Sequence, residues 1–300
     1  MVGSFAARDF PPARVLEAKG GRRVSVCVPA RDEEATIAAV VEVLVGDLLG
    51  PGLIDEVVVI DDASSDATAA RAGAAGAAVR PAASVLSAYP AGPGKGEAMW
   101  RGVHITDGDI VVFCDADVVH FDAAFVLGLV GPLLERDDLA LVKAHYQRPL
   151  DGRDGEGGRV TELMARPLIA ALFPHLSGML QPLAGEFAAR REVLGAVPFA
   201  GGYAVDLGLL IDISARWGAQ AIAQCDLGRR IHRNRPLAEL GPQALAILLL
   251  GLERAGMGGL HHQGEGRWIS ALQRPGSPDA VVSLITLPPL HLLDAGRRPA

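Results

Sequence analysis

Two aspartates separated by one alanine stand at the end of an apolar run, in the stretch DIVVFCDADVV. Residues 109–114 have the composition of a strand buried on both faces, and Asp115 and Asp117 follow it. Because the chain turns where a strand ends, both carboxylates can face one crevice, where they would repel each other. A divalent cation shared with phosphate oxygens removes that repulsion, and Mg²⁺ and Mn²⁺ favour oxygen ligands. The pattern therefore predicts a metal–phosphate site, and the alternative is a solvated turn with two helix-capping aspartates.

The elements that position this pair follow an alternation of strands and helices. Short β-branched runs predict further strands at 24–28, 56–60 and 139–146. Apolar residues at intervals of three and four predict a helix after the first strand with Asp32 as its N-cap, and Ser64 or Ser65 would cap the alanine-rich helix that follows. The pattern predicts an α/β fold, a Rossmann-like, mostly parallel sheet with helices on both faces. Ligands of such sheets bind beyond the carboxyl ends of the strands, where PARDEE, DDASSD and DAD lie.

The composition is that of a globular chain and excludes several classes of function. A net charge of -7 over 300 residues argues against a nucleic-acid binder. The longest apolar run, 244–252, is too short to cross a bilayer and the N-terminal residues do not look like a signal peptide, so we expect a cytoplasmic protein with no membrane partner. Cys27, Cys114 and Cys225 stand singly in apolar contexts, which predicts buried thiols.

A lysine in a glycine-rich turn is a second candidate phosphate contact. Within PAGPGKGEAMW (90–100), Lys95 opens a predicted helix, whose first N–H groups favour anions. The stretch is not a P-loop, because Gly96 stands where Ser or Thr is required, and an ordinary loop with a solvated lysine is the alternative. The first strand is followed by PARDEE instead of G-x-G-x-x-G, which disfavours a nicotinamide-dependent enzyme.

Two basic segments follow in the second half of the chain. GRRIHRNRP (228–236) is either a solvated face or a source of one metal ligand, His232, and of arginines that contact phosphate. GGRVTEL (157–163) places Arg159 and Thr161 at the start of a predicted helix, which is a second candidate anion site. Two anion sites suggest two phosphate-bearing substrates.

A series of motifs in unbroken order over residues 24–255 resembles one known family. The motifs are PARDEEATI, VVVIDDASSDAT, GPGKGEAMWRG, IVVFCDAD, LVKAHYQRPL, GGRVTELMARPL, LQPLAGEFAARREVL, GYAVDLGLLID and IAQCDLGRRIHRNRPLAELG. Together they resemble the glucosyl-3-phosphoglycerate synthases, which are retaining glycosyltransferases of the GT-A fold and close relatives of the mannosyl-3-phosphoglycerate synthases.

The resemblance implies a homodimer that transfers glucose from UDP-glucose to 3-phosphoglycerate with Mg²⁺ or Mn²⁺ as cofactor. It implies Asp117 and His232 as metal ligands, and a catalytic set of Asp117, Lys95, Arg230 and Asp206. The implied contacts to the nucleotide sugar are Pro29, Ala30, Arg31, Glu33, Asp62, Lys95, Asp115, Ala116, Leu183, Gly185, Glu186, Tyr203, Asp206 and Arg230. The implied contacts to the acceptor are Gly158, Arg159, Thr161 and Asn234.

On this basis we expect four parts along the chain. Residues 1–22 form a loosely ordered lead-in, and residues 23–149 bind the nucleotide sugar. Residues 150–256 bind the acceptor and complete the metal site within the same GT-A domain. Residues 257–300 form a C-terminal tail that packs on the fold or trails it.

The chain departs from the family pattern at several of these positions. The family commonly has D-S-D where Asp115-Ala116-Asp117 stands, serine at Asp62, leucine at Arg31, asparagine at Asp32 and glutamate at Asp206. These changes concern the donor, so GDP-mannose or GDP-glucose is the alternative to UDP-glucose, and a non-catalytic nucleotide-sugar-binding protein is a further alternative. Nucleotidyltransferases fit less well, because they have a glycine-rich loop after the first strand and PARDEE lacks those glycines. Processive inverting glycosyltransferases also fit less well, because their Q-x-x-R-W motif requires a Gln three residues before Arg216 and none stands there.

Overall fold

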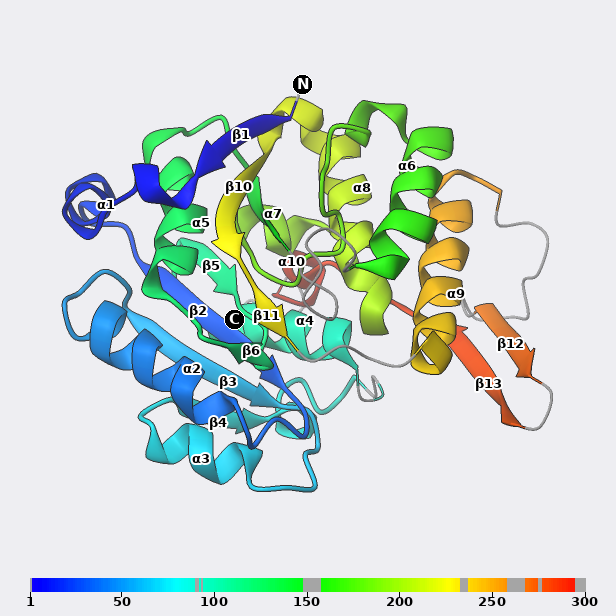
Figure 1. Cartoon of the computed structure of the whole chain (residues 1–300), viewed down its shortest axis with the longest axis horizontal. Helices are drawn as coiled ribbons and strands as arrows, with labels where there is room; N and C mark the ends of the chain where they lie inside the picture. Colours follow the sequence, from blue (N-terminus) through cyan, green and yellow to red (C-terminus); the bar gives the residue numbers. More distant parts are fainter. Residues whose placement is uncertain are drawn as a thin grey trace, which may run out of the picture.

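An eight-stranded sheet forms the centre of the molecule (Figure 1). The computed structural model describes residues 2–89, 92, 94–147, 158–232, 237–257, 268–274 and 277–294. The strands of this sheet run in the order β1-β10-β7-β8-β5-β2-β3-β4, and β8 is antiparallel to both of its neighbours. The expected mostly parallel sheet is confirmed. The bounds are β1 Gly3–Ala6, β2 Val24–Ala30, β3 Glu56–Asp61, β4 Ala78–Pro81, β5 Ile110–Phe113, β7 Leu141–Gln147, β8 Phe187–Arg190 and β10 Ile222–Arg229.

Alternate side chains of the central strands enter two separate apolar cores. In β2, Val26 and Val28 pack in one core and Cys27 in the other. Full burial of a valine or leucine side chain stabilises a fold by about 1.5–3 kcal/mol, so a strand buried on both faces is strongly favoured in the middle of the sheet. This explains why the apolar runs in the sequence predicted these strands.

Helices cover both faces of the sheet. The core on one face contains residues of α1, α2, α3 and α5, and the core on the other contains residues of α4, α6, α7, α8, α9 and α10. The bounds are α1 Pro12–Lys19, α2 Ile37–Val43, α3 Thr68–Ala74, α4 Lys95–Ile105, α5 Ala123–Glu135, α6 Arg166–Leu172, α7 Arg191–Ala196, α8 Val205–Trp217, α9 Leu237–Arg254 and α10 Leu290–Asp294. A π-helical segment, Leu44–Leu49, continues α2, and another, Thr161–Ala165, precedes α6.

The order of the strands reverses beside β2. The chain passes from β2 outward to β3 and β4, and α4 then carries it back to β5 on the other side of β2. Gly102 lets α4 lie close to β2, since a Cβ there would stand 2.3 Å from Cys27 Sγ. Such a reversal opens a crevice at the carboxyl ends of the strands.

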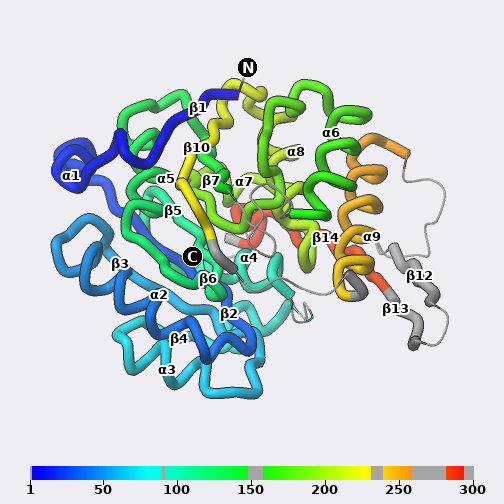
Figure 2. The backbone as a smooth tube through the Cα atoms, viewed as in Figure 1, coloured from blue at the N-terminus to red at the C-terminus, as the bar shows by residue number. Residues whose placement is uncertain are grey.

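The first residues of the chain are more ordered than the sequence suggested. Residues 3–6 form β1, an edge strand that pairs in parallel with β10, and α1 follows at Pro12–Lys19. Figure 2 shows these two strands, which lie far apart in the sequence, side by side. The expectation of a loosely ordered lead-in was wrong because β1 is short and gains its hydrogen bonds from a distant strand.

The predicted helix caps were also wrong. The helix after β2 begins at Ile37, and Asp32 lies in the preceding loop at φ 53°. Asp32 Oδ1 accepts hydrogen bonds from the backbone N–H and the hydroxyl of Ser65, at 2.7 and 3.0 Å. At α3 the carboxylate of Asp66, rather than Ser64 or Ser65, accepts the N–H of Thr68 at 2.9 Å. The hydrogen bonds between Asp32 and Ser65 tie together the two loops that follow β2 and β3.

Four two-residue strands and one hairpin complete the part of the chain that the structure describes. They are β6 Val118–Val119, β9 Phe199–Ala200, β11 Ile231–His232 and β14 Thr286–Leu287, with the hairpin β12 Trp268–Arg274 and β13 Ser277–Leu284. In the C-terminal part, β14 pairs with β9, and Trp100 Nε1 donates to the carbonyl oxygen of Pro288 at 2.9 Å. This part of the expected tail therefore packs on the fold.

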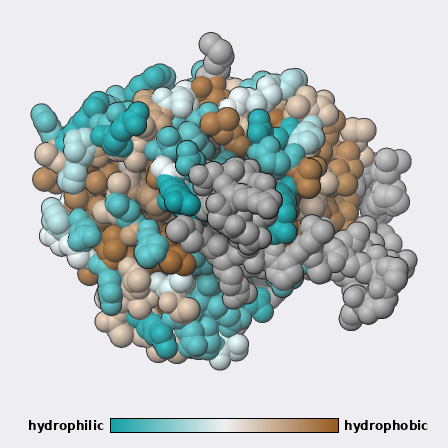
Figure 3. Space-filling view, viewed as in Figure 1, coloured by the Kyte–Doolittle hydropathy of each residue, from teal (hydrophilic) through white to brown (hydrophobic). Residues whose placement is uncertain are grey.

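The surface mixes polar and apolar side chains. In the space-filling view, apolar surface gathers on the side where α6 and α9 lie (Figure 3). Within the described part of the chain, every helix is too short or too polar to cross a membrane.

The three cysteines yield a first prediction. Cys27, Cys114 and Cys225 are buried free thiols, as expected from the sequence, and burial raises the pKa of each, that of Cys225 to about 12. Because the thiolate is the reactive form, we expect no reaction with Ellman's reagent at pH 8 in the folded protein, and reaction of all three thiols in guanidinium chloride. Stoichiometric labelling of the folded protein would contradict this burial.

Candidate functional site

A cavity of about 380 Å³ lies at the carboxyl ends of β2, β3 and β5, where the strand order reverses. Ten residues that the sequence analysis assigned to the donor or the metal line it. They are Pro29, Ala30, Arg31, Glu33, Asp62, Lys95, Asp115, Ala116, Asp117 and Tyr203. Gly94, Ala98 and Gly202 line it as well and were not anticipated. Residues from separate stretches of sequence therefore meet in one hollow.

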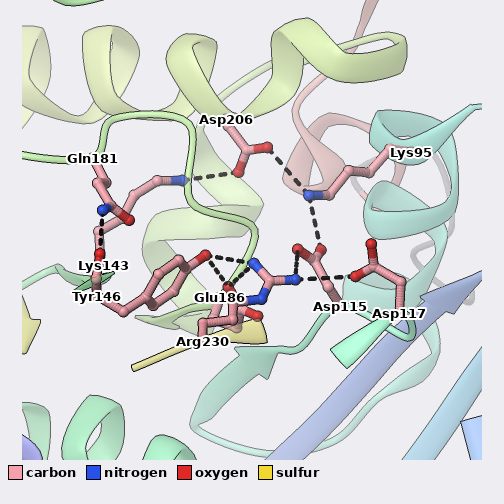
Figure 4. Close-up of polar contacts among 9 residues, drawn as sticks. All are labelled: Lys95, Asp115, Asp117, Lys143, Tyr146, Gln181, Glu186, Asp206 and Arg230. Atoms are coloured by element: carbon pink, nitrogen blue, oxygen red, sulfur yellow. Dashed lines mark hydrogen bonds and ion pairs between the residues drawn. The ribbon is translucent and has the colours of Figure 1, made fainter. Parts of the chain in front are cut away.

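Lys95 enters this cavity from the first turn of α4. Its Nζ donates to Asp115 Oδ1 at 3.0 Å and to Asp206 Oδ2 at 3.3 Å (Figure 4). Burial by itself would lower the pKa of Lys95, but the two carboxylates outweigh that effect and raise it above its usual value. The side chain is therefore a fixed positive charge at the cavity wall.

Arg230, which follows directly after β10, explains how two aspartates can stand one residue apart. One guanidinium nitrogen, NH2, donates to both Asp115 Oδ2 and Asp117 Oδ1 at 3.0 Å. The other, NH1, donates to Glu186 Oε2 at 3.0 Å and to the hydroxyl of Tyr146. Burial would lower the pKa of Arg230, but these partners raise it well above its usual value. Arg230 is only 3% exposed and lies behind the aspartates, so in this structure it acts on the cavity through them.

Asp115 is the carboxylate shared between these two cations. Burial alone would raise its pKa, but Lys95 and Arg230 hold the pKa well below the usual range, so the group is ionised at neutral pH. Gly185 lies against it, because a Cβ at that position would stand 2.1 Å from Asp115 Oδ1. The glycine that the family resemblance placed near the sugar thus makes room for this carboxylate.

A second carboxylate, Asp206, is held in the first turn of α8 between Lys95 and Lys143. Lys143 Nζ donates to Asp206 Oδ1 at 2.8 Å. The sequence analysis assigned no role to Lys143 or to Tyr146, although a lysine inside the apolar strand LVKAHY was a usable signal. The network drawn in Figure 4 contains four carboxylates, of Asp115, Asp117, Glu186 and Asp206, and three cations, Lys95, Lys143 and Arg230.

The network suits a divalent cation in charge and in donor chemistry. It carries one negative charge in excess, and Asp117 offers a partly exposed carboxylate to the cavity. Mg²⁺ is commonly held by one or two carboxylates together with substrate phosphates. β11 pairs with β6 so that His232 stands opposite Val118, which puts the backbone of His232 beside Asp117. The described side chains contain no cluster of three or more His, Cys, Asp or Glu for a metal, and the His232 side chain is outside them. The metal assignment stays a prediction.

At the β3 end of the cavity, a buried aspartate lies near an arginine. Asp62 is buried to 7% exposure, and Arg31 NH1 lies 3.9 Å from its Oδ2. Burial raises the pKa of Asp62, and the charge of Arg31 opposes that shift. Neighbouring strands are about 4.8 Å apart, and β2 lies between β3 and β5, so Asp62 stands roughly 10 Å from the aspartates after β5.

The described part of the structure does not test the site assigned to the acceptor. Gly158 and Arg159 precede the π-helical segment that begins at Thr161, and Thr161 is 3% exposed. Asn234 lies outside the described residues. Leu183, which was assigned to the nucleotide sugar and not to the acceptor, packs at the edge of the core that contains α4 and α8. Their roles stay predictions.

Comparison with known proteins identifies the family. Residues 25–194 match the model of glycosyl transferase family 2. A glucosyl-3-phosphoglycerate synthase of Mycolicibacterium paratuberculosis is 50% identical over 252 residues, which cover 82% of this chain and 76% of that protein. The chain belongs to the glucosyl-3-phosphoglycerate synthases.

Solved structures of this family agree with the fold. The glucosyl-3-phosphoglycerate synthase of Mycobacterium tuberculosis in complex with Mn²⁺, UDP-glucose and phosphoglyceric acid has a TM-score of 0.87 and 43% identity, with coverage of 97% of this chain and 99% of that chain. The same enzyme in complex with Mg²⁺ and UDP has a TM-score of 0.85 and 44% identity, with the same coverage. The predicted family and GT-A fold are confirmed.

Gly185 provides a test of the Asp115 geometry. A methyl group in Gly185→Ala would displace the carboxylate, and we expect turnover of a nucleotide-sugar donor to fall about 10- to 100-fold. Gly178→Ala is the matched control, because a Cβ there meets nothing within 4 Å. Equal activity of both variants, with both folded by circular dichroism, would show that the position of Asp115 is unimportant.

Proposed function

We propose that this chain is a metal-dependent, retaining hexosyltransferase that moves glucose from UDP-glucose to 3-phosphoglycerate. The observation that carries this proposal is the cavity at the strand-order reversal, where Asp115 and Asp117 are held between cations in a chain of this family. The product is glucosyl-3-phosphoglycerate.

The leaving group explains the charges of the site. Cleavage of the bond between the sugar and the diphosphate builds negative charge on the diphosphate. Lys95 is already ionised and fixed at the cavity wall, so it stabilises that charge without reorganisation. Arg230 contributes by keeping Asp115 ionised and by holding Asp115 and Asp117 in place through its hydrogen bonds. A bound Mg²⁺ or Mn²⁺, held by Asp117 and His232, would neutralise part of the same charge.

Retention of configuration needs no protein base. When the acceptor hydroxyl attacks from the side of the leaving group, the departing phosphate oxygen can take its proton. We therefore assign no general base. In this proposal Asp62 and Arg31 would contact the base of the nucleotide, and Glu186, Asp206 and Tyr203 would lie at the sugar end.

The acceptor and the assembly complete the proposal. Arg159 and Thr161, with Gly158 and Asn234, would bind the phosphate or carboxylate of 3-phosphoglycerate. We also propose a cytoplasmic location and a homodimer. Leu163, 76% exposed in the segment before α6, is a candidate contact between subunits, and sedimentation velocity measures the state of assembly.

A donor panel tests the reaction. UDP-glucose, GDP-glucose, GDP-mannose and ADP-glucose are each incubated with 3-phosphoglycerate and with Mg²⁺, Mn²⁺ or EDTA, and the anomer of the product is read by NMR. We expect metal-dependent transfer from UDP-glucose with retention. Preference for a GDP-linked sugar would favour the alternative donor, and nucleotide binding without release of nucleoside diphosphate would indicate a non-catalytic binder.

Substitution of Asp117 tests the role of the aspartate pair. We expect Asp117→Ala to lower kcat by about 100- to 1,000-fold, as removal of a major electrostatic contributor does. Asp122→Ala is the control on the same segment, because Asp122 only caps α5 by accepting the N–H of Ala124 at 2.8 Å. This control should lose about 1 kcal/mol of stability and keep its kcat. Near-normal turnover of Asp117→Ala would refute the role of Asp117.

A further inference from the structure

Lys143 is the most deeply buried cation of the site and lies outside the lining of the cavity. It projects from the middle of β7 and is 1% exposed. Its Nζ lies 4.9 Å from the centre of the Phe187 ring and 2.8 Å from Asp206 Oδ1. Burial lowers the pKa of Lys143, and the charge of Asp206 opposes that shift. A buried ammonium group is costly unless it is paired, so the position of Lys143 against Asp206 calls for an explanation beyond packing.

Asp206 links this buried lysine to the cavity wall. One carboxylate oxygen accepts from Lys143 and the other from Lys95, at 3.3 Å. An ammonium group has three hydrogens, and Lys95 directs two of them to Asp115 and Asp206. The third is available to a ligand in the cavity that Lys95 lines.

The sharing of carboxylates keeps the charge of Lys95 from being cancelled. Asp115 is shared with Arg230, and Asp206 is shared with Lys143. Without Lys143, the whole negative charge of Asp206 would act on Lys95 and draw it away from Asp115. In the low dielectric of a buried site, this increase in the attraction between Asp206 and Lys95 is larger than it would be in water.

We propose that Lys143 is a positioning residue that acts through Asp206 to keep Lys95 available for the diphosphate of the donor. The proposal rests on the proposed function only in naming the ligand as a nucleoside diphosphate. Lys143 touches neither substrate nor metal in this role.

A double-mutant cycle with UDP as the probe tests this coupling. The affinity for UDP in the presence of Mg²⁺ is measured by calorimetry for the wild type, Lys143→Met, Asp206→Asn and the double variant. We expect Lys143→Met to bind UDP about tenfold more weakly. The double variant should match Asp206→Asn within about twofold, because Lys143 has nothing to act through once the carboxylate is gone.

Lys19→Met is the matched control. Lys19 is a second buried lysine, and its Nζ lies 2.9 Å from Asp55 Oδ2 on the opposite side of the sheet from α4. Its loss should lower the melting temperature and leave the affinity for UDP unchanged. A general effect of removing a buried lysine is thereby separated from an effect on Lys95.

Each result bears on the proposal. Wild-type affinity in Lys143→Met, or effects of the two substitutions that multiply in the double variant, would overturn it. If Lys143→Met does not fold, the double variant, which removes both charges of the pair, is compared with Asp206→Asn, and a difference above about fivefold overturns it. Transfer of glucose by the wild type is assayed in parallel. Absence of transfer with intact UDP binding refutes the proposed function while the affinities still decide the role of Lys143, and absence of UDP binding refutes both.

Discussion

Every carboxylate at the heart of this site needs a cation, and the cations come from distant parts of the chain. Asp115 is held by Lys95, twenty residues before it, and by Arg230, 115 residues after it. Asp206 joins the first turn of α8 to α4 and to β7. Breaking a buried ion pair by removal of one partner typically costs about 3–5 kcal/mol. The helices α4 and α8, the strands β7 and β10 and the loop after β5 must therefore all be in place before any of these charges is stable.

The same constraint makes the site ready for its substrates. Side chains that are already ionised and fixed need no reorganisation when charge develops on a leaving group. The network has more carboxylates than cations, which suits a divalent cation, and in the proposed function that cation together with Lys95 would bind the diphosphate. The cavity extends along the strand ends from Asp117 to Asp62.

The central strands could be predicted from the sequence because burial on both faces leaves a continuous apolar run. The polar ends of β2, β3 and β5 could be placed in one crevice for the same reason, since parallel strands end at one edge of a sheet. β1 and β8 escaped prediction because each has four residues and is defined by partners far away in the sequence. Asp32 was misassigned because its left-handed backbone belongs to a loop that binds the neighbouring loop through Ser65. Arg230 was expected to face the diphosphate, which stays a prediction, and the pattern of basic residues could not reveal its ion pairs with Asp115, Asp117 and Glu186.

The anomalous signal of Mn²⁺ in a crystal grown with UDP tests the central claim most directly. We predict one strong peak bonded to a carboxylate oxygen of Asp117, an imidazole nitrogen of His232 and oxygens of the diphosphate, with Lys95 still between Asp115 and Asp206. A nucleotide bound with its phosphates away from these groups, or manganese at another place, would contradict the roles of the paired aspartates and of the cations that hold them.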